Sequence, residues 1–121
     1  MKESLIFVYN ANSGKANAIL DVYHKIASPG TYKCNLCKLT HGIFKERTRW
    51  KNFRQNLKIE LDFLHANEFR KQYASASMRK FKLPVVLKKG NEGLDVFISC
   101  DELNKMDRLE QLISLIEKRL D

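Results

Sequence analysis

The residues best suited to chemistry are two cysteines, Cys34 and Cys37, which are separated by two residues. This spacing occurs in redox dithiols and in one half of many zinc sites. A cysteine thiolate can attack a disulfide, and a neighbouring cation such as Lys38 stabilises the anion. His41, four residues after Cys37, could act as a base or as a partner of the thiolate. Thiol–disulfide exchange is therefore the first hypothesis for this segment, with chemically inert cysteines as the alternative.

A metal site is a second hypothesis for the same residues. Cys34, Cys37 and His41 have the spacing of three zinc ligands, and tetrahedral zinc needs a fourth ligand. His24 or Cys100 could supply it only through the tertiary fold. Because there is no second Cys-x-x-Cys and no closely spaced histidine pair, the pattern is half a site. We predict no resident metal or other cofactor, and we expect Cys100 to be a small buried residue.

Two other stretches match anion-binding patterns only in part. The turn at 10–15 precedes a helical pattern, but a phosphate loop needs glycine where Tyr9 stands and Ser or Thr where Ala16 stands. We interpret this turn as a helix cap. The basic stretch around Trp50 could contact a nucleic acid, yet Trp50 lies on the apolar side of its helical pattern. We therefore expect Trp50 in the core and do not expect a nucleic-acid partner.

Length and composition predict one domain, 1–121, and we expect it in the cytoplasm because the first apolar stretch, 5–9, is too short for the core of a signal peptide. The chain has 121 residues, of which 44% are hydrophobic and 30% charged, with a net charge of +8; these values are typical of a globular domain. It contains no apolar run near the roughly 18 residues that cross a bilayer, so we expect no membrane association. Residues 41–90 carry 13 Lys/Arg against 4 Asp/Glu, whereas residues 91–121 carry 4 against 8. This basic middle could bind an anionic partner, although such charge more often forms a solvated face.

The hydrophobic pattern predicts an α/β fold. Two runs, at 5–9 and 84–88, are largely apolar, as in central strands covered on both faces, whereas 58–64 and 94–99 alternate as edge strands do. Short helical crossovers between strands favour parallel pairing, which gives a four-stranded mixed sheet flanked by helices. Helices are expected at about 15–27, 39–56 and 67–73 and at the C-terminus, with a loop at 31–39 that holds the two cysteines.

The order of these elements resembles that of a divergent thioredoxin-like protein. The resemblance covers nearly the whole chain. Besides element order, it rests on the Cys-x-x-Cys with Tyr32 before it and Lys38 after it, and on Leu83-Pro84 at the start of the third strand. The stretch Cys34-Asn35-Leu36-Cys37-Lys38-Leu39-Thr40-His41-Gly42 also resembles a motif of uncharacterised bacterial proteins, which implies no activity.

The resemblance implies a thioredoxin-like fold with an extra helix inserted after the first strand. It also implies a cis bond before Pro84, which faces the dithiol, and attack on a partner disulfide by Cys34, with Cys37 resolving the mixed disulfide. In that superfamily the dithiol follows the first strand directly, whereas here Cys34 comes 25 residues after Tyr9. A helix at 15–27 carries the chain about 20 Å away, and the next ten residues can return about 30 Å. We therefore still expect the cysteines at a helix N-terminus near Pro84.

The function that follows from the sequence is that of a thiol–disulfide oxidoreductase or redox sensor using Cys34, Cys37, His41 and Pro84. Its partner would be a protein disulfide or a small thiol. The alternative is a non-catalytic thioredoxin-fold module that binds a protein or an anionic partner and has structural or zinc-bound cysteines. The sequence leaves the oligomeric state open.

Overall fold

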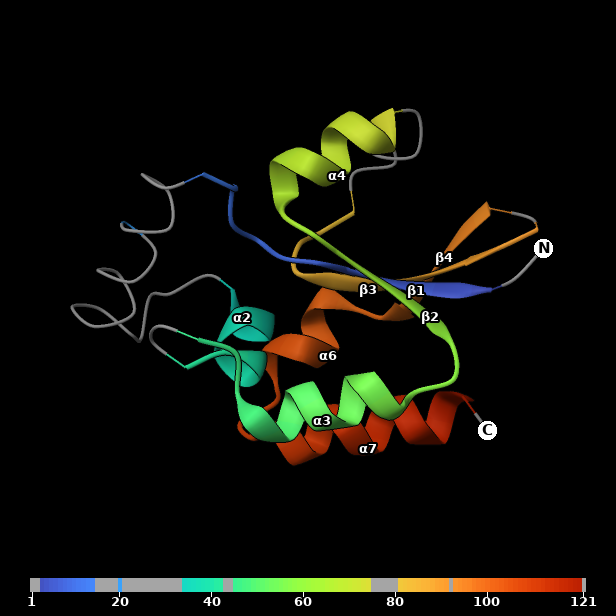
Figure 1. Ribbon diagram of the computed structural model, residues 1–121. Coiled ribbons are helices and arrows are strands. Elements are labelled where there is room, and N and C mark those ends of the chain that lie inside the picture. Colours follow the sequence, from blue (N-terminus) through green and yellow to red (C-terminus); the bar gives the residue numbers. More distant parts are fainter. Residues whose placement is uncertain are drawn as a thin grey trace.

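The sheet is formed by four strands in the order β2-β1-β3-β4 (Figure 1). The computed structural model describes residues 3–14, 20, 34–42, 45–74, 81–91 and 93–120. Strand β1 pairs in parallel with β2 and antiparallel with β3, and β3 pairs antiparallel with β4. The predicted α/β fold with a four-stranded mixed sheet and two inner strands is confirmed. The strands are β1 (Ser4–Val8), β2 (Glu60–Leu64), β3 (Val85–Gly90) and β4 (Gly93–Ile98).

Helices cover both faces of this sheet (Figure 1). One face carries α4 (Ala66–Gln72). Successive side chains of a strand point to opposite faces of the sheet. In the inner strand β1, Leu5 and Phe7 belong to one apolar cluster, and Ile6 and Val8 belong to the other. Strand β1 is therefore buried on both faces. The opposite face carries α2 (Asn35–Thr40), α3 (Thr48–Asn56), α6 (Cys100–Asn104) and α7 (Leu109–Leu120).

The larger apolar cluster lies between the sheet and the pair of helices α3 and α7, which pack against each other. The Phe7 ring is stacked on Phe63 at 5.0 Å and meets Trp50 edge-on at 5.5 Å. Trp50 is fully buried, so its expected place in the core is confirmed. Helix α7 contributes an apolar stripe of the spacing typical of an amphipathic helix, formed by Leu109, Leu112, Ile113 and Ile116.

The prediction of a single helix at 39–56 is wrong, because the end of α2 and the whole of α3 occupy this part of the chain. Helix α2 ends at Thr40, and the backbone of His41 is extended. The N–H of Gly42 donates to the carbonyl of Lys45 at 2.8 Å, so the chain makes a turn before α3. Glycine is a poor helix former, and its position inside the apparent stripe marks this break. The expected loop at 31–39 is also corrected, since α2 begins at Asn35.

Helix α6 has no counterpart among the predicted helices. Ser99 caps it: the Ser99 hydroxyl accepts the Glu102 N–H at 3.1 Å, and the Glu102 carboxylate accepts the Ser99 N–H at 2.9 Å. This reciprocal pair is a capping box, whose signature is Ser or Thr followed three residues later by Glu or Gln. The helix could therefore have been predicted from the sequence.

The helix expected at 15–27, inserted after the first strand, lies outside the described residues except for Leu20, whose side chain is 64% exposed. Tyr32 lies outside them as well. In the part of the chain that the structure describes, no helix combines the length and apolar character needed to cross a membrane.

Candidate dithiol site

Cys34 and Cys37 lie at the start of α2, with their sulfurs 2.16 Å apart and their Cα atoms 5.3 Å apart. Cys34 is the N-cap residue of the helix. Residues three positions apart face the same side of a helix, so the first turn of α2 brings the two sulfurs together. Leu36 and Leu39 are buried and hold α2 in the larger apolar cluster. The pair is thus at disulfide distance on a helix fixed by its own apolar residues.

The Cys34 sulfur accepts two backbone hydrogen bonds. One comes from the N–H of Cys37 at 3.3 Å, a donor in the first turn of α2, which has no partner within its helix. The other comes from the N–H of Asn10, also at 3.3 Å, in the segment that follows β1. Hydrogen bonds to the charged form of a group favour that form. Both donors therefore favour a negative charge on Cys34 when the disulfide is open.

The two sulfur-bearing residues differ in exposure. Cys34 is 1% exposed and Cys37 is 8% exposed, although both fall in the buried class. Lys38, the next residue after Cys37, is exposed to solvent. The surface thus reaches the site on the side of Cys37, with a cation beside it.

Asn35, the first residue between the cysteines, ties α2 to α6. Its side-chain amide donates to the carbonyls of Leu103 at 2.5 Å and Met106 at 2.9 Å. The Leu103 carbonyl also accepts the Met106 N–H at 3.2 Å, and Met106 lies just beyond the end of α6, so Asn35 adds a donor at the C-terminal end of this helix. No local pattern in the sequence indicates this role, because the partners are 68 and 71 residues away. The geometry of the cysteine turn is therefore fixed by a long-range contact.

Pro84 lies at the same end of the sheet as the cysteines. Strands β1 and β3 are antiparallel, with Val8 opposite Val85, so the residues after β1 lie beside the start of β3. Asn10, which donates to the Cys34 sulfur, is one of the residues after β1. Pro84 itself is buried, and the peptide bond before it is cis, as the resemblance implied.

His41 follows the dithiol turn directly, and its N–H donates to the carbonyl of Cys37 at 2.9 Å. The ring Nδ1 lies 2.8 Å from the Thr40 hydroxyl, and the ring meets Tyr9 edge-on at 5.9 Å. Thr40 donates its only hydroxyl proton to the carbonyl of Leu36 at 2.9 Å. The Thr40 hydroxyl thus contacts both the backbone of α2 and the His41 ring. A role for His41 as base or thiolate partner stays a prediction.

Tyr9 is buried next to these groups. Burial raises the pKa of its phenol to about 12, against a smaller opposing effect of a hydrogen bond with Thr40. A charged phenolate in this position would lose most of its hydration. Tyr9 is therefore neutral at physiological pH and presents an aromatic edge contact and a hydroxyl to the site.

Basic residues of the predicted charge-rich segment hold the connection between α2 and α3. The Arg54 guanidinium donates two hydrogen bonds to the Glu46 carboxylate, at 2.6 and 2.8 Å. These bonds lower the pKa of Glu46. The Arg47 guanidinium donates to the carbonyl of Lys38 at 3.1 Å. Two of these cations thus have structural partners beside the dithiol.

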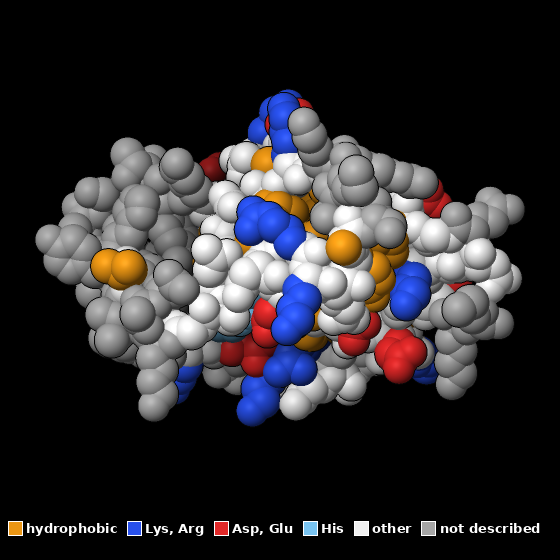
Figure 2. Space-filling view, turned by 90° about the horizontal axis from the view of Figure 1, so that it is seen from above, with side chains coloured by type: hydrophobic (Ala, Val, Ile, Leu, Met, Phe, Trp, Pro, Cys, Tyr) orange, Lys and Arg blue, Asp and Glu red, His pale blue; other side chains and the backbone are white. Residues whose placement is uncertain are grey.

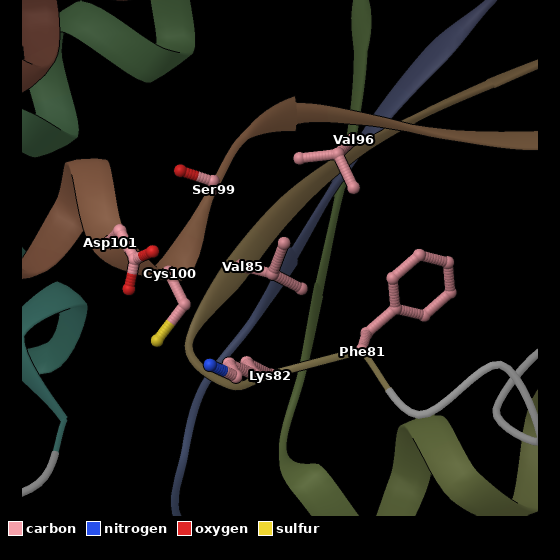
Figure 3. A pocket seen from close by; sticks show the side chains of 7 residues that line it. All are labelled: Phe81, Lys82, Val85, Val96, Ser99, Cys100 and Asp101. Carbon is pink, nitrogen blue, oxygen red and sulfur yellow. The ribbon is translucent and has the colours of Figure 1, made fainter.

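The third cysteine, Cys100, is free and partly exposed, so the expectation that it would be buried is corrected. Its thiol donates to the carbonyl of Leu83 at 3.4 Å. It also lines a small pocket of about 130 Å³ beside β4, where the side chain of Val96 is 50% exposed (Figure 3). The pocket combines an apolar floor with a few polar groups and is lined by Phe81, Lys82, Val85, Val96, Ser99, Cys100 and Asp101.

The face that carries α4 has a mixed surface (Figure 2). Lysine and arginine side chains there lie among aspartate and glutamate side chains and next to uncovered hydrophobic ones. This mixture on the described part of the face is typical of a solvated surface.

No group of three or more histidine, cysteine, aspartate or glutamate side chains suited to a metal ion occurs within the described residues. Zinc binds cysteine as thiolate, and the sulfurs of Cys34 and Cys37 are joined to each other instead. His24, one of the two further ligands considered, lies outside the described residues.

Comparisons of the chain with protein-family models, with curated proteins and with solved structures gave no match. The function of the dithiol site must therefore be inferred from its own residues and their geometry.

Proposed function

We propose that this chain is a thioredoxin-like thiol–disulfide exchange protein, acting as an oxidoreductase or redox sensor through Cys34 and Cys37. One observation carries the proposal: Cys34 caps α2 at disulfide distance from Cys37 while its sulfur accepts two backbone N–H groups. A disulfide opens readily when one of its sulfurs is stabilised as a thiolate.

Other features support the same assignment. The sheet order β2-β1-β3-β4, with β3 antiparallel to both neighbours, agrees with the thioredoxin-like fold that the sequence resembles. The dithiol lies at the end of the sheet where β3 begins, directly after Pro84, which supports the arrangement that the resemblance implies.

The proposed reaction transfers two electrons between two sulfur pairs. A cysteine thiolate of the reduced protein attacks a partner disulfide, one partner thiolate leaves, and a mixed disulfide forms. The second cysteine attacks the mixed disulfide, closes the Cys34–Cys37 bond and expels the other partner thiolate. The protein dithiol is oxidised and the partner disulfide is reduced; the reverse sequence oxidises a partner dithiol. Protein disulfides and small disulfides such as oxidised glutathione both fit this chemistry.

The test is a redox titration of the purified protein in glutathione buffers, read by the mass added when free thiols are trapped. We expect Cys34 and Cys37 to change together and reversibly between dithiol and disulfide. Cys34→Ser should abolish the paired change, whereas Cys100→Ser serves as the matched control and should keep it. A pair that neither opens nor re-forms across these buffers would refute the proposal.

A further inference from the structure

We infer that Cys37 is the sulfur that meets the partner and that Cys34 is the sheltered sulfur that leaves as a thiolate. This inference rests on the proposed function and states which cysteine reacts with the partner and which one leaves. It reverses the roles implied by the resemblance, in which Cys34 attacks first. Two independent observations carry it, namely the unequal exposure of the cysteines and the unequal placement of backbone donors.

The first observation is access. Disulfide exchange needs the attacking sulfur, the attacked sulfur and the leaving sulfur nearly in line, so the attacked sulfur must be reachable from outside. Cys37 is 8% exposed and Cys34 is 1% exposed. The exposed Lys38 directly follows Cys37 and can attract an anionic thiol to that side. A thiolate therefore reaches the disulfide at Cys37.

The second observation concerns the leaving group. When an outside thiolate attacks Cys37, the bond to Cys34 breaks and charge develops on the Cys34 sulfur. That sulfur already accepts the N–H groups of Asn10 and Cys37, each at 3.3 Å. A stabilised thiolate leaves faster. Both donors thus lie where this direction of attack places the charge.

The side chain of Asn35 holds the Cys34 sulfur in position beside the N–H of Asn10. Through its bonds to the carbonyls of Leu103 and Met106, it fixes the turn that carries Cys34 against the end of α6. Because the residue next to Cys34 is anchored, the buried sulfur stays beside the Asn10 donor when the disulfide opens. Asn35 is therefore a positioning residue for the leaving group.

The complete cycle balances as follows for the reduced protein. The Cys37 thiolate attacks a partner disulfide, a Cys37–partner bond forms, and the first partner thiolate leaves and takes a proton from water. The Cys34 thiolate then attacks the Cys37 sulfur, the Cys34–Cys37 bond closes, and the second partner thiolate leaves. The protein loses two electrons, and the partner disulfide gains them.

The test compares Cys34→Ser with Cys37→Ser, both in a Cys100→Ser background, with oxidised glutathione as the probe. Each variant retains one cysteine of the pair, and mass spectrometry measures how fast it gains glutathione. Because the rate of exchange depends on access to the sulfur as well as on its ionisation, we expect the variant that retains the more exposed Cys37 to react at least about tenfold faster than the variant that retains Cys34. Equal rates, or faster reaction at Cys34, would overturn the inference while leaving the proposed function in place.

A second measurement keeps both cysteines of the pair and therefore does not depend on the folding of the single-cysteine variants. The oxidised Cys100→Ser protein is mixed with reduced glutathione, quenched in acid and digested, and the sulfur that carries glutathione is located. Glutathione on Cys37 supports the inference, and glutathione on Cys34 overturns it. If the disulfide never opens and neither single-cysteine variant gains glutathione, the proposed function fails together with the inference.

Discussion

Replacing Asn10 by proline removes one of the two N–H donors from the Cys34 sulfur, since proline has no backbone N–H. Asn10→Ala is the matched control, because it removes the same side chain and keeps the donor. Proline restricts the preceding residue to extended backbone. Tyr9 fits this requirement, since its N–H donates to the carbonyl of Leu64 at 2.9 Å and continues the pairing of β1 with β2.

The expected effect follows from the strength of one charge-assisted hydrogen bond. Such a bond contributes about 1.5–3 kcal/mol. Because sulfur at 3.3 Å from the nitrogen is a weak acceptor, we expect this one to contribute about 1.5 kcal/mol. One pKa unit corresponds to about 1.4 kcal/mol. Asn10→Pro should therefore raise the pKa of the Cys34 thiol by about 1 unit relative to Asn10→Ala. Where Cys34 is ionised in the parent protein, the potential of the pair should fall by about 30 mV.

Two assays measure this effect. The pH dependence of alkylation, in a Cys37→Ser and Cys100→Ser background, gives the pKa of Cys34 alone. Equilibration of the intact pair with glutathione gives the potential, and circular dichroism checks that each variant is folded. If Asn10→Pro and Asn10→Ala give the same pKa for Cys34, the Asn10 N–H does not stabilise the thiolate and the reasoning is refuted.

Three further predictions concern the surroundings of the site. Asn35→Ala should lower the free energy of unfolding by about 1–3 kcal/mol in urea denaturation, because the Met106 carbonyl loses the Asn35 amide and the Leu103 carbonyl keeps only the Met106 N–H; an unchanged midpoint would show that water replaces the amide. Hydrogen bonding, chiefly with Arg119, lowers the pKa of Glu102 from 4.5 to about 2, so its stabilisation is complete above pH 4.5 and lost as pH falls toward 2. The side chains of Glu102 and Arg119 are each over one-third exposed, so solvent screening limits their contribution to the free energy of unfolding to about 1 kcal/mol. The difference in melting temperature between Glu102→Gln and the parent protein should therefore vanish near pH 2. Burial raises the pKa of Tyr9 from 10.0 to about 12, so the stability it contributes is complete below pH 10 and falls between pH 10 and 12; an ultraviolet titration should show a late tyrosine step that Tyr9→Phe removes.

The sheet could be predicted from sequence because burial leaves a local pattern. Strands covered on both faces are apolar at successive positions, and strands covered on one face alternate, which is how β1 and β3 were distinguished from β2 and β4. The bounds of the helices were harder to predict from the sequence than those of the strands. The apolar stripe between 39 and 56 is compatible with one helix, and only the glycine at position 42 marks the turn that divides it. The capping box at Ser99 was a usable local signal for α6.

The cysteine pair could be identified from its spacing, but its environment could not. The donor at Asn10 and the sulfur of Cys34 are 24 residues apart, and their contact depends on how α2 packs beside the end of β1. The tie from Asn35 to α6 is longer still. Neither contact has a local signature, because a backbone N–H is present at nearly every residue and an asparagine amide can bond in many settings. The inserted helix at 15–27 stays a prediction.

The donors at Cys34 join reduction to folding in a single thermodynamic cycle. The Asn10 contact exists only when the strand end and the helix start have assembled, so an unfolded chain cannot offer it to the sulfur. The free energy by which the folded protein stabilises the Cys34 thiolate therefore has two measurable effects. It makes the disulfide easier to reduce, and it raises the free energy of unfolding of the reduced protein. For this contribution, the difference in denaturation between the reduced and oxidised forms and their equilibrium with glutathione report the same free energy.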